Sequence, residues 1–126
     1  MILKDSLYTI LGKDKTFGGA SYEIQINPQH YIYAAHFPEE PVTPGVCILQ
    51  IAQELLAMTV DKELSIRKIK NAKFTAVISP KQLKQLCVTL TKVTEIEKEV
   101  SCQCIITSKE SELVCAKLSF TCVKNG

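Results

Sequence analysis

The stretch AHFPEEPVTPGVCILQIAQELL, residues 35 to 56, contains the residues of this chain whose types and spacing could do chemistry. His36 is followed by three prolines within seven residues, and a Thr-Pro-Gly corner then leads into a long apolar run. A histidine in isolation is more often a core or loop residue, and we interpret His30 as a loop residue. The question for His36 is which chemistry it could do here, and which partner group it would need.

The apolar run predicts a helix from residue 44 to about residue 60. Thr43 is a suitable N-cap, and Pro44 suits the first helical position because its missing N–H would be unpaired there anyway. Apolar residues cover most of the circumference, namely Val46, Cys47, Ile48, Leu49, Ile51, Ala52, Leu55, Leu56, Met58 and Val60. A helix that is apolar nearly all round is expected to be buried.

The rest of the chain is rich in β-forming residues. Residues 2 to 11 could form a short N-terminal helix. Alternating or β-rich runs separated by short polar connections predict strands at 21–27, 66–79, 82–93, 99–108 and 112–123. One buried helix and about five antiparallel strands indicate an α+β fold, in which the sheet curls around the helix.

The composition indicates a single domain covering residues 1–126, because 46% of the residues are apolar and no Pro/Gly/Ser-rich linker interrupts the chain. A net charge of +2 is too small for binding nucleic acid through phosphate neutralisation. The longest apolar run is shorter than the ~18 residues of a membrane span, and the first ten residues lack a signal pattern. We therefore expect no nucleic acid, no membrane insertion and a cytoplasmic location.

Six cysteines raise the question of disulfides or metal. Cys102 and Cys104 form a C-x-C pair, but no Cys/His pair has zinc spacing. Residues two apart on a strand share a face, so these cysteines align with Val100 and Ile106 in an apolar row. We predict that they act as small buried hydrophobes in a reducing compartment, without metal. No phosphate loop or nucleotide fingerprint occurs, and no cofactor is expected.

The segment HFPEEPVTPGV and its apolar helix resemble the HFPGxPxxPGV signature of the hot-dog-fold (3R)-hydroxyacyl-[acyl-carrier-protein] dehydratases, FabZ and FabA, of fatty-acid synthesis. INPQHYIYAAHFP and NAKFTAVISPKQ extend a weaker resemblance over roughly residues 20 to 123. The resemblance implies a hot-dog fold, a curled antiparallel sheet around one long buried helix. It also implies a hydro-lyase that removes water from a β-hydroxyacyl thioester.

This elimination requires a base for the α-proton, charge stabilisation on the thioester oxygen and an acid for the departing hydroxyl. The resemblance gives the base role to His36. The helix beginning at Pro44 offers unpaired N–H groups at its positive end, so Gly45 and Val46 are the candidate oxyanion donors. Gly45 also lacks a Cβ, which lets a thioester approach its backbone closely.

The position of the family's acid departs from the pattern. In the family it is a Glu or Asp fourteen residues after the histidine, and it serves the active site across a dimer interface. Here that residue is Gln50, whose amide can orient a hydroxyl or water but cannot readily donate a proton. Glu54 stands one helical turn further along, about 6 Å away, and is alternatively a solvated or ion-paired helix residue. Glu39 replaces a glycine of the signature, which affects the turn that would aim His36.

An acyl tunnel is expected to open beside His36, lined near the helix start by Phe37, Pro44, Val46 and Ile48. No acid occurs between Glu63 and Glu95, whereas seven basic residues do: Arg67, Lys68, Lys70, Lys73, Lys81, Lys84 and Lys92. They form either an ordinary solvated strand face or a surface that attracts an acidic acyl carrier protein. We expect the acyl thioester to be carried by acyl carrier protein or by coenzyme A.

Assembly and activity remain open between several alternatives. A small sheet around one helix leaves an edge strand exposed, which predicts a homodimer or a higher even oligomer, with a heterodimer as a further option. The function is a dehydratase-like activity with Gln50 or Glu54 in the acid's place, or a catalytically silent subunit that binds acyl chains or pairs with an active dehydratase. The third alternative is an acyl thioesterase in which Gln50 orients the attacking water.

Overall fold

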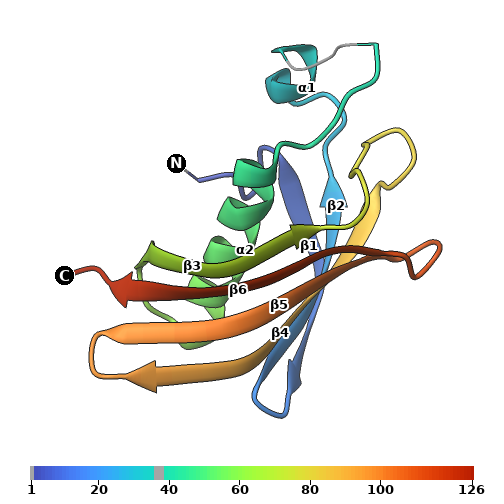
Figure 1. Cartoon of the computed structure of the whole chain (residues 1–126). Helices are drawn as coiled ribbons and strands as arrows, with labels where there is room; N and C mark the ends of the chain where they lie inside the picture. Colours follow the sequence, from blue (N-terminus) through green and yellow to red (C-terminus); the bar gives the residue numbers. More distant parts are fainter. Residues whose placement is uncertain (1, 36–38) are drawn as a thin grey trace.

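The computed structural model describes residues 2–35 and 39–126. One antiparallel sheet has the strand order β1-β2-β4-β5-β6-β3. The elements are β1 (Tyr8–Thr16), β2 (Gly19–Ile26), α1 (Tyr31–Ala35), α2 (Gly45–Val60), β3 (Leu64–Phe74), β4 (Gln85–Ile96), β5 (Glu99–Ser108) and β6 (Val114–Lys124). The sheet curls around α2, as Figure 1 shows, so the expected α+β architecture is confirmed.

The core lies between α2 and the concave face of the sheet. On β5, Val100, Cys102, Cys104 and Ile106 are all at most 3% exposed, so the predicted apolar row is confirmed. All six cysteines are free thiols, and five of them are buried. Cysteine here fills the core as a small apolar side chain. No helix among residues 2–35 and 39–126 is long and apolar enough to cross a membrane.

The N-terminal region differs from the prediction. Residues 2 to 11 do not form a helix, because Tyr8–Thr16 is the strand β1, which pairs antiparallel with β2. β1 is an edge strand whose residues after Tyr8 are largely exposed, and such a strand shows little of the alternation that identifies strands in sequence. The sheet therefore has six strands instead of five. The strand expected at 66–79 is β3, which ends earlier, at Phe74.

The start of α2 is also shifted by one residue. Pro44 is the N-cap and Gly45 the first helical residue, with no side chain capping the helix. Thr43 was predicted as the cap, but its Oγ1 is 2.8 Å from the Tyr33 hydroxyl instead. That hydrogen bond occupies the side chain that would otherwise reach the helix amides, so the cap prediction is wrong.

Only one face of α2 is buried in the single chain. The buried residues are Cys47, Ile48, Ile51, Ala52, Glu54, Leu55 and Leu56. Val46 and Met58 are 66% and 38% exposed. The apolar circumference of the helix thus exceeds what the sheet covers, and the prediction of burial nearly all round does not hold for this chain.

Candidate active site

His36 and Phe37, the predicted base and a predicted tunnel residue, lie outside the described residues. The flanks of their segment are anchored to the rest of the chain. Tyr33 is buried in α1, and its hydroxyl hydrogen-bonds to Thr43. The Thr43 amide donates to the carbonyl oxygen of Ile78 at 2.9 Å. The described residues on both sides of this segment are therefore anchored, and Thr43 lies next to the start of α2.

The start of α2 presents unpaired amides, as the sequence predicts. The amides of Cys47 and Ile48 both donate to the Pro44 carbonyl oxygen, at 3.0 and 3.2 Å. The preceding amides, those of Gly45 and Val46, make no hydrogen bond to any residue of the described segments. Two N–H groups at the positive end of a 16-residue helix are suited to stabilise a negatively charged oxygen.

Gly45 lies against an aromatic ring from the end of β3. A Cβ built on Gly45 would be 3.1 Å from Phe74 Cζ, closer than side chains normally pack. Gly45, Phe74 and Ile48 help to line a cavity of about 340 Å³ at this end of the helix. The absence of a side chain at Gly45 thus leaves room for the ring beside the helix amides. Ile48, one of the expected tunnel residues, lines this cavity, whereas the Val46 side chain is 66% exposed.

Gln50 and Glu54 lie elsewhere, in a groove of about 750 Å³ bounded by α2, the first residues of β3 and the N-terminal segment. Gln50 Nε2 donates to Glu54 Oε2 at 2.7 Å, across one helical turn. The structure therefore brings Gln50 together with Glu54, and Gly45 together with Ile48. Within one chain, these two pairs line separate hollows.

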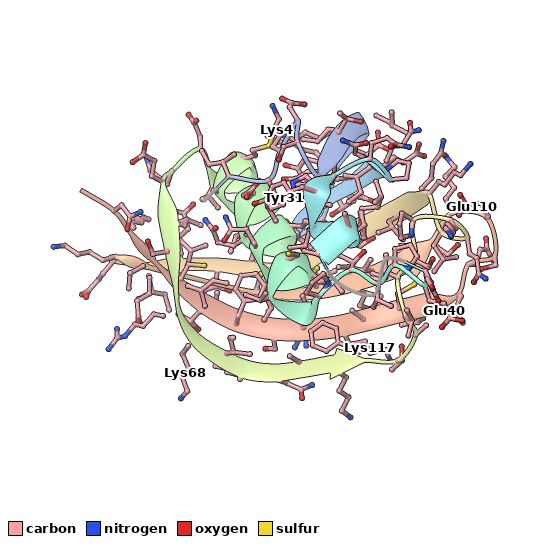
Figure 2. All side chains as sticks on the ribbon, turned by 90° about the horizontal axis from the view of Figure 1, so that it is seen from above. Lys4, Tyr31, Glu40, Lys68, Glu110 and Lys117 are labelled. Atoms are coloured by element: carbon pink, nitrogen blue, oxygen red, sulfur yellow. The ribbon has the colours of Figure 1, made fainter. Side chains whose placement is uncertain are left out.

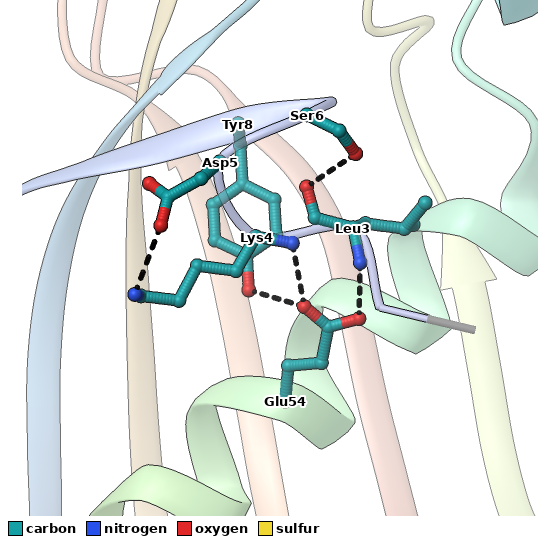
Figure 3. A network of polar contacts seen from close by, with 6 residues as sticks. All are labelled: Leu3, Lys4, Asp5, Ser6, Tyr8 and Glu54. Atoms are coloured by element: carbon teal, nitrogen blue, oxygen red, sulfur yellow. Dashed lines mark hydrogen bonds and ion pairs between the residues drawn. The ribbon is translucent and has the colours of Figure 1, made fainter.

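The Glu54 carboxylate is the centre of a polar network, shown in Figure 3. The amide of Leu3 donates to Oε2 at 2.8 Å, and the amide of Lys4 donates to Oε1 at 2.9 Å. The Tyr8 hydroxyl also donates to Oε1, at 2.9 Å. Glu54 is 9% exposed, so the interpretation as a solvated or ion-paired residue is wrong. Its partners among the described residues are amides and a hydroxyl, and they fix the N-terminal segment to α2.

Burial, and then the hydrogen bond to Glu54, raise the pKa of Tyr8 above its usual range. Tyr8 therefore remains a neutral donor at any ordinary pH. Sequence reasoning missed this network, since two of its donors are backbone amides about 50 residues from Glu54. The one available signal was a carboxylate on the buried helix face, because Glu54 follows Cys47 and Ile51 at helical spacing.

Comparison with known proteins places the fold and motif in a family. A sequence model of the ApeI-like family, described as ApeI dehydratase, matches residues 13–117. The chain belongs to the ApeI-like dehydratase family. The match includes the motif, the whole of α2 and most of the sheet.

The chain is also similar to 3-hydroxyacyl-[acyl-carrier-protein] dehydratases named FabZ. The protein from Bartonella bacilliformis is 34% identical over 99 residues, which cover 72% of this chain and 62% of that protein. The protein from Clostridium botulinum is 33% identical over 75 residues, covering 54% of this chain and 52% of its own length. The chain thus spans about half the length of the Clostridium relatives that it matches.

Solved structures confirm the hot-dog fold. A chain of the dehydratase heterocomplex ApeI:P from Xenorhabdus doucetiae has a TM-score of 0.72 at 14% identity, covering 92% of this chain and 97% of that one. A hypothetical thioesterase from Streptococcus pneumoniae, solved with coenzyme A, has a TM-score of 0.65 at 12% identity, covering 94% and 86%. At such identities the likeness concerns the fold alone.

Proposed function

We propose that this ApeI-like chain is a subunit of an enzyme that eliminates water from β-hydroxyacyl thioesters in fatty-acyl or related lipid biosynthesis. The observation that carries the proposal is the pair of unpaired amides, Gly45 and Val46, at the start of α2. They are the last two residues of the motif that begins with His36. An elimination next to a thioester needs this combination of a base and an oxyanion site.

In the proposed reaction, His36 takes the α-proton and the thioester oxygen gains negative charge. The amides of Gly45 and Val46 donate to that oxygen, and one such donor typically contributes ~10²–10³ in rate. The bond from the β-carbon to the hydroxyl then breaks. Because Gln50 has no acidic proton, the imidazolium formed at His36 returns its proton to the leaving oxygen, and water is released.

The test is turnover of a 3-hydroxyacyl pantetheine, followed by the absorbance of the unsaturated thioester. His36→Ala should abolish turnover, since no second base is proposed. The control is His30→Asn. His30 Nδ1 accepts the amide of Ile32 at 3.1 Å, and asparagine can replace that acceptor without an imidazole. Equal turnover of His36→Ala and wild type would refute the dehydratase assignment.

A second hot-dog subunit is proposed to complete the site. β3 is an edge strand, and Ile69 and Phe74 lie opposite the buried residues Phe120 and Ala116, so they share the concave face. Ile69 and Phe74 are nevertheless 46% and 45% exposed. A partner placed against this strip and the outer side of α2 would cover them. It would also bring the Gln50 groove of one subunit to the helix start of the other.

The partner is a second copy of this chain or a related dehydratase subunit. The similar structure from Xenorhabdus doucetiae is a dehydratase heterocomplex, which supports the second option. Sedimentation of the purified chain at micromolar concentration distinguishes the two cases. If the purified chain sediments as a dimer, the partner is a second copy of this chain. If it sediments as a monomer and shows no turnover, the proposal requires a related dehydratase subunit as the partner.

The proposed carrier is an acidic acyl carrier protein that docks on the outer side of β3, with coenzyme A as the alternative. Lys73 lies directly opposite Lys117 in the β3–β6 register, and both are exposed. Like charges opposite each other on a sheet cost stability, which an acidic partner would offset. Lys68 lies on the same outer side and points away from α2 in Figure 2. Arg67 is already paired with Glu99.

An acyl thioesterase is the second candidate function, favoured by the Gln50 side chain and by the fold likeness to the Streptococcus pneumoniae thioesterase. An amide can orient a water molecule toward a thioester carbonyl held by the same helix amides. Release of free thiol from a saturated acyl pantetheine, which cannot be dehydrated, would select this reaction. We also propose a cytoplasmic location, because free cysteines are usual in a reducing compartment.

A further inference from the structure

The Gln50 amide has a fixed direction because of its neighbour one turn along α2. Its Nε2 donates to Glu54 Oε2 at 2.7 Å. A carboxylate can only accept hydrogen bonds, whereas an amide has one donating and one accepting end. The contact therefore selects one of the two amide orientations, in which the nitrogen faces Glu54 and the oxygen points away from it.

Glu54 can impose this direction because it is itself held on several sides. The amides of Leu3 and Lys4 and the hydroxyl of Tyr8 donate to its two oxygens, as Figure 3 shows. These donors belong to the N-terminal segment and to β1, so they do not move with the side chains of α2. Rotating the carboxylate toward the groove would leave buried donors without an acceptor, which is costly.

We propose that Glu54 is a positioning residue that makes the amide oxygen the end of Gln50 that meets the substrate, and so favours acyl chains that carry a hydroxyl group. This inference rests on the proposed function, because it assumes that the acyl chain reaches Gln50. Gln50 lines the groove beside β3. Its amide oxygen has two lone pairs, so it can accept a substrate hydroxyl whatever else contacts it.

The test compares two unreactive ligands that differ only in the hydroxyl. They are a 3-hydroxyacyl pantetheine and the saturated acyl pantetheine of equal length, each with an amide in place of the thioester. One neutral hydrogen bond corresponds to a preference of about 2- to 10-fold for the hydroxylated ligand in wild type. Glu54→Gln should remove this preference and leave the affinity for the saturated ligand unchanged, because the neighbour then no longer fixes the amide direction.

Tyr8→Phe is the matched control. It deletes a donor to the same carboxylate and loosens the same N-terminal segment, but it leaves the contact between Gln50 and Glu54 intact. The variant should be less stable than wild type and should retain the preference. A preference that survives in Glu54→Gln, or that is lost equally in Tyr8→Phe, overturns the positioning role.

A measurement on wild type decides the case in which Glu54→Gln does not fold. The Gln50 side-chain amide and the Leu3 backbone amide both donate to Glu54 Oε2, so their protons should show a nuclear Overhauser effect. Gln50→Met assigns the side-chain signals by their disappearance. Absence of the effect overturns the inference. If neither ligand binds wild type saturably, the proposed function falls with it, whereas binding without preference overturns the inference alone.

Discussion

Replacing Gln50 by glutamate would put an acidic side chain at the position where the resemblance to the FabZ and FabA dehydratases implies one, but we expect the single change to destabilise the protein. The new carboxylate would replace an amide nitrogen that lies 2.7 Å from Glu54 Oε2. Glu54 cannot withdraw, because Leu3, Lys4 and Tyr8 hold it from the other side. Two buried or half-buried carboxylates would then face each other.

The loss of stability in Gln50→Glu can be calculated from charge repulsion or from protonation, and both give a similar value. Two ionised carboxylates that relax to about 4 Å still repel by about 4 kcal/mol at an effective dielectric constant of 20. Alternatively the pair takes up one proton, and protonating a carboxyl of ordinary pKa at pH 7 costs roughly 4 kcal/mol before the shared hydrogen bond returns part of it. The free energy of unfolding of Gln50→Glu should thus be about 2 to 4 kcal/mol lower than that of wild type at pH 7.

The pH dependence has a definite sign. The folded Gln50→Glu variant binds a proton that the unfolded chain releases above its ordinary carboxyl pKa, so its stability falls as pH rises from about 4 toward 7. At pH 5 the same protonation costs only about 1 kcal/mol, and the difference from wild type should shrink accordingly. The same change at the exposed Gln103 is the control and should show neither effect.

Urea denaturation of the two single variants and of the double variant Gln50→Glu/Glu54→Gln tests this reasoning at fixed protein concentration. The double variant again has one carboxylate and one amide, so we expect a favourable coupling of at least about 2 kcal/mol at pH 7. It should also dehydrate a hydroxyacyl substrate at least about tenfold faster than wild type, since it regains a general acid. Two results would refute the contact between residues 50 and 54. One is a Gln50→Glu variant as stable as wild type at both pH values. The other is a double variant whose change in the free energy of unfolding equals the sum of the changes in the two single variants.

Four further outcomes follow from the structure. Among the six thiols, Cys87 should be alkylated first in the folded protein, since the other cysteines are buried. Burial raises the pKa of Cys102 and of Cys122 to about 12, so the folded chain keeps protons that the unfolded chain releases, and urea midpoints should fall as pH rises from about 8.5 toward 12. Ile69→Lys should shift a wild-type dimer toward monomer in sedimentation, with little change in the fold detected by circular dichroism. Gly45→Ala should raise the activation free energy of dehydration, measured from kcat, by more than it lowers the free energy of unfolding. The reason is that the new methyl group displaces the Phe74 ring beside the helix amides.

The elements that position the motif were predictable because their signals are local. The Thr-Pro-Gly corner and the apolar run identified α2 to within a residue, and strand β5 was predicted at its observed bounds. β1 was missed because an edge strand is not constrained to alternate, and Thr43 was misjudged because its hydroxyl bonds to Tyr33. In each case a contact with a neighbouring segment, which the residue pattern does not show, decided the outcome.

Positions 50 and 54 on α2 differ in what surrounds a carboxylate placed there. A carboxylate at position 50 would face the groove, whereas the carboxylate at 54 accepts the two amides of Leu3 and Lys4 and the Tyr8 hydroxyl. A proton placed on either Glu54 oxygen would point at a group that is already donating, so protonation would break at least one of these bonds. Glu54 is therefore poorly suited to deliver a proton to a substrate, although it is only one helical turn from position 50. Under the proposed function, Glu54 acts on the substrate through the Gln50 amide that it holds, and for that reason the direction of Gln50, rather than the acidity of Glu54, is the property to test.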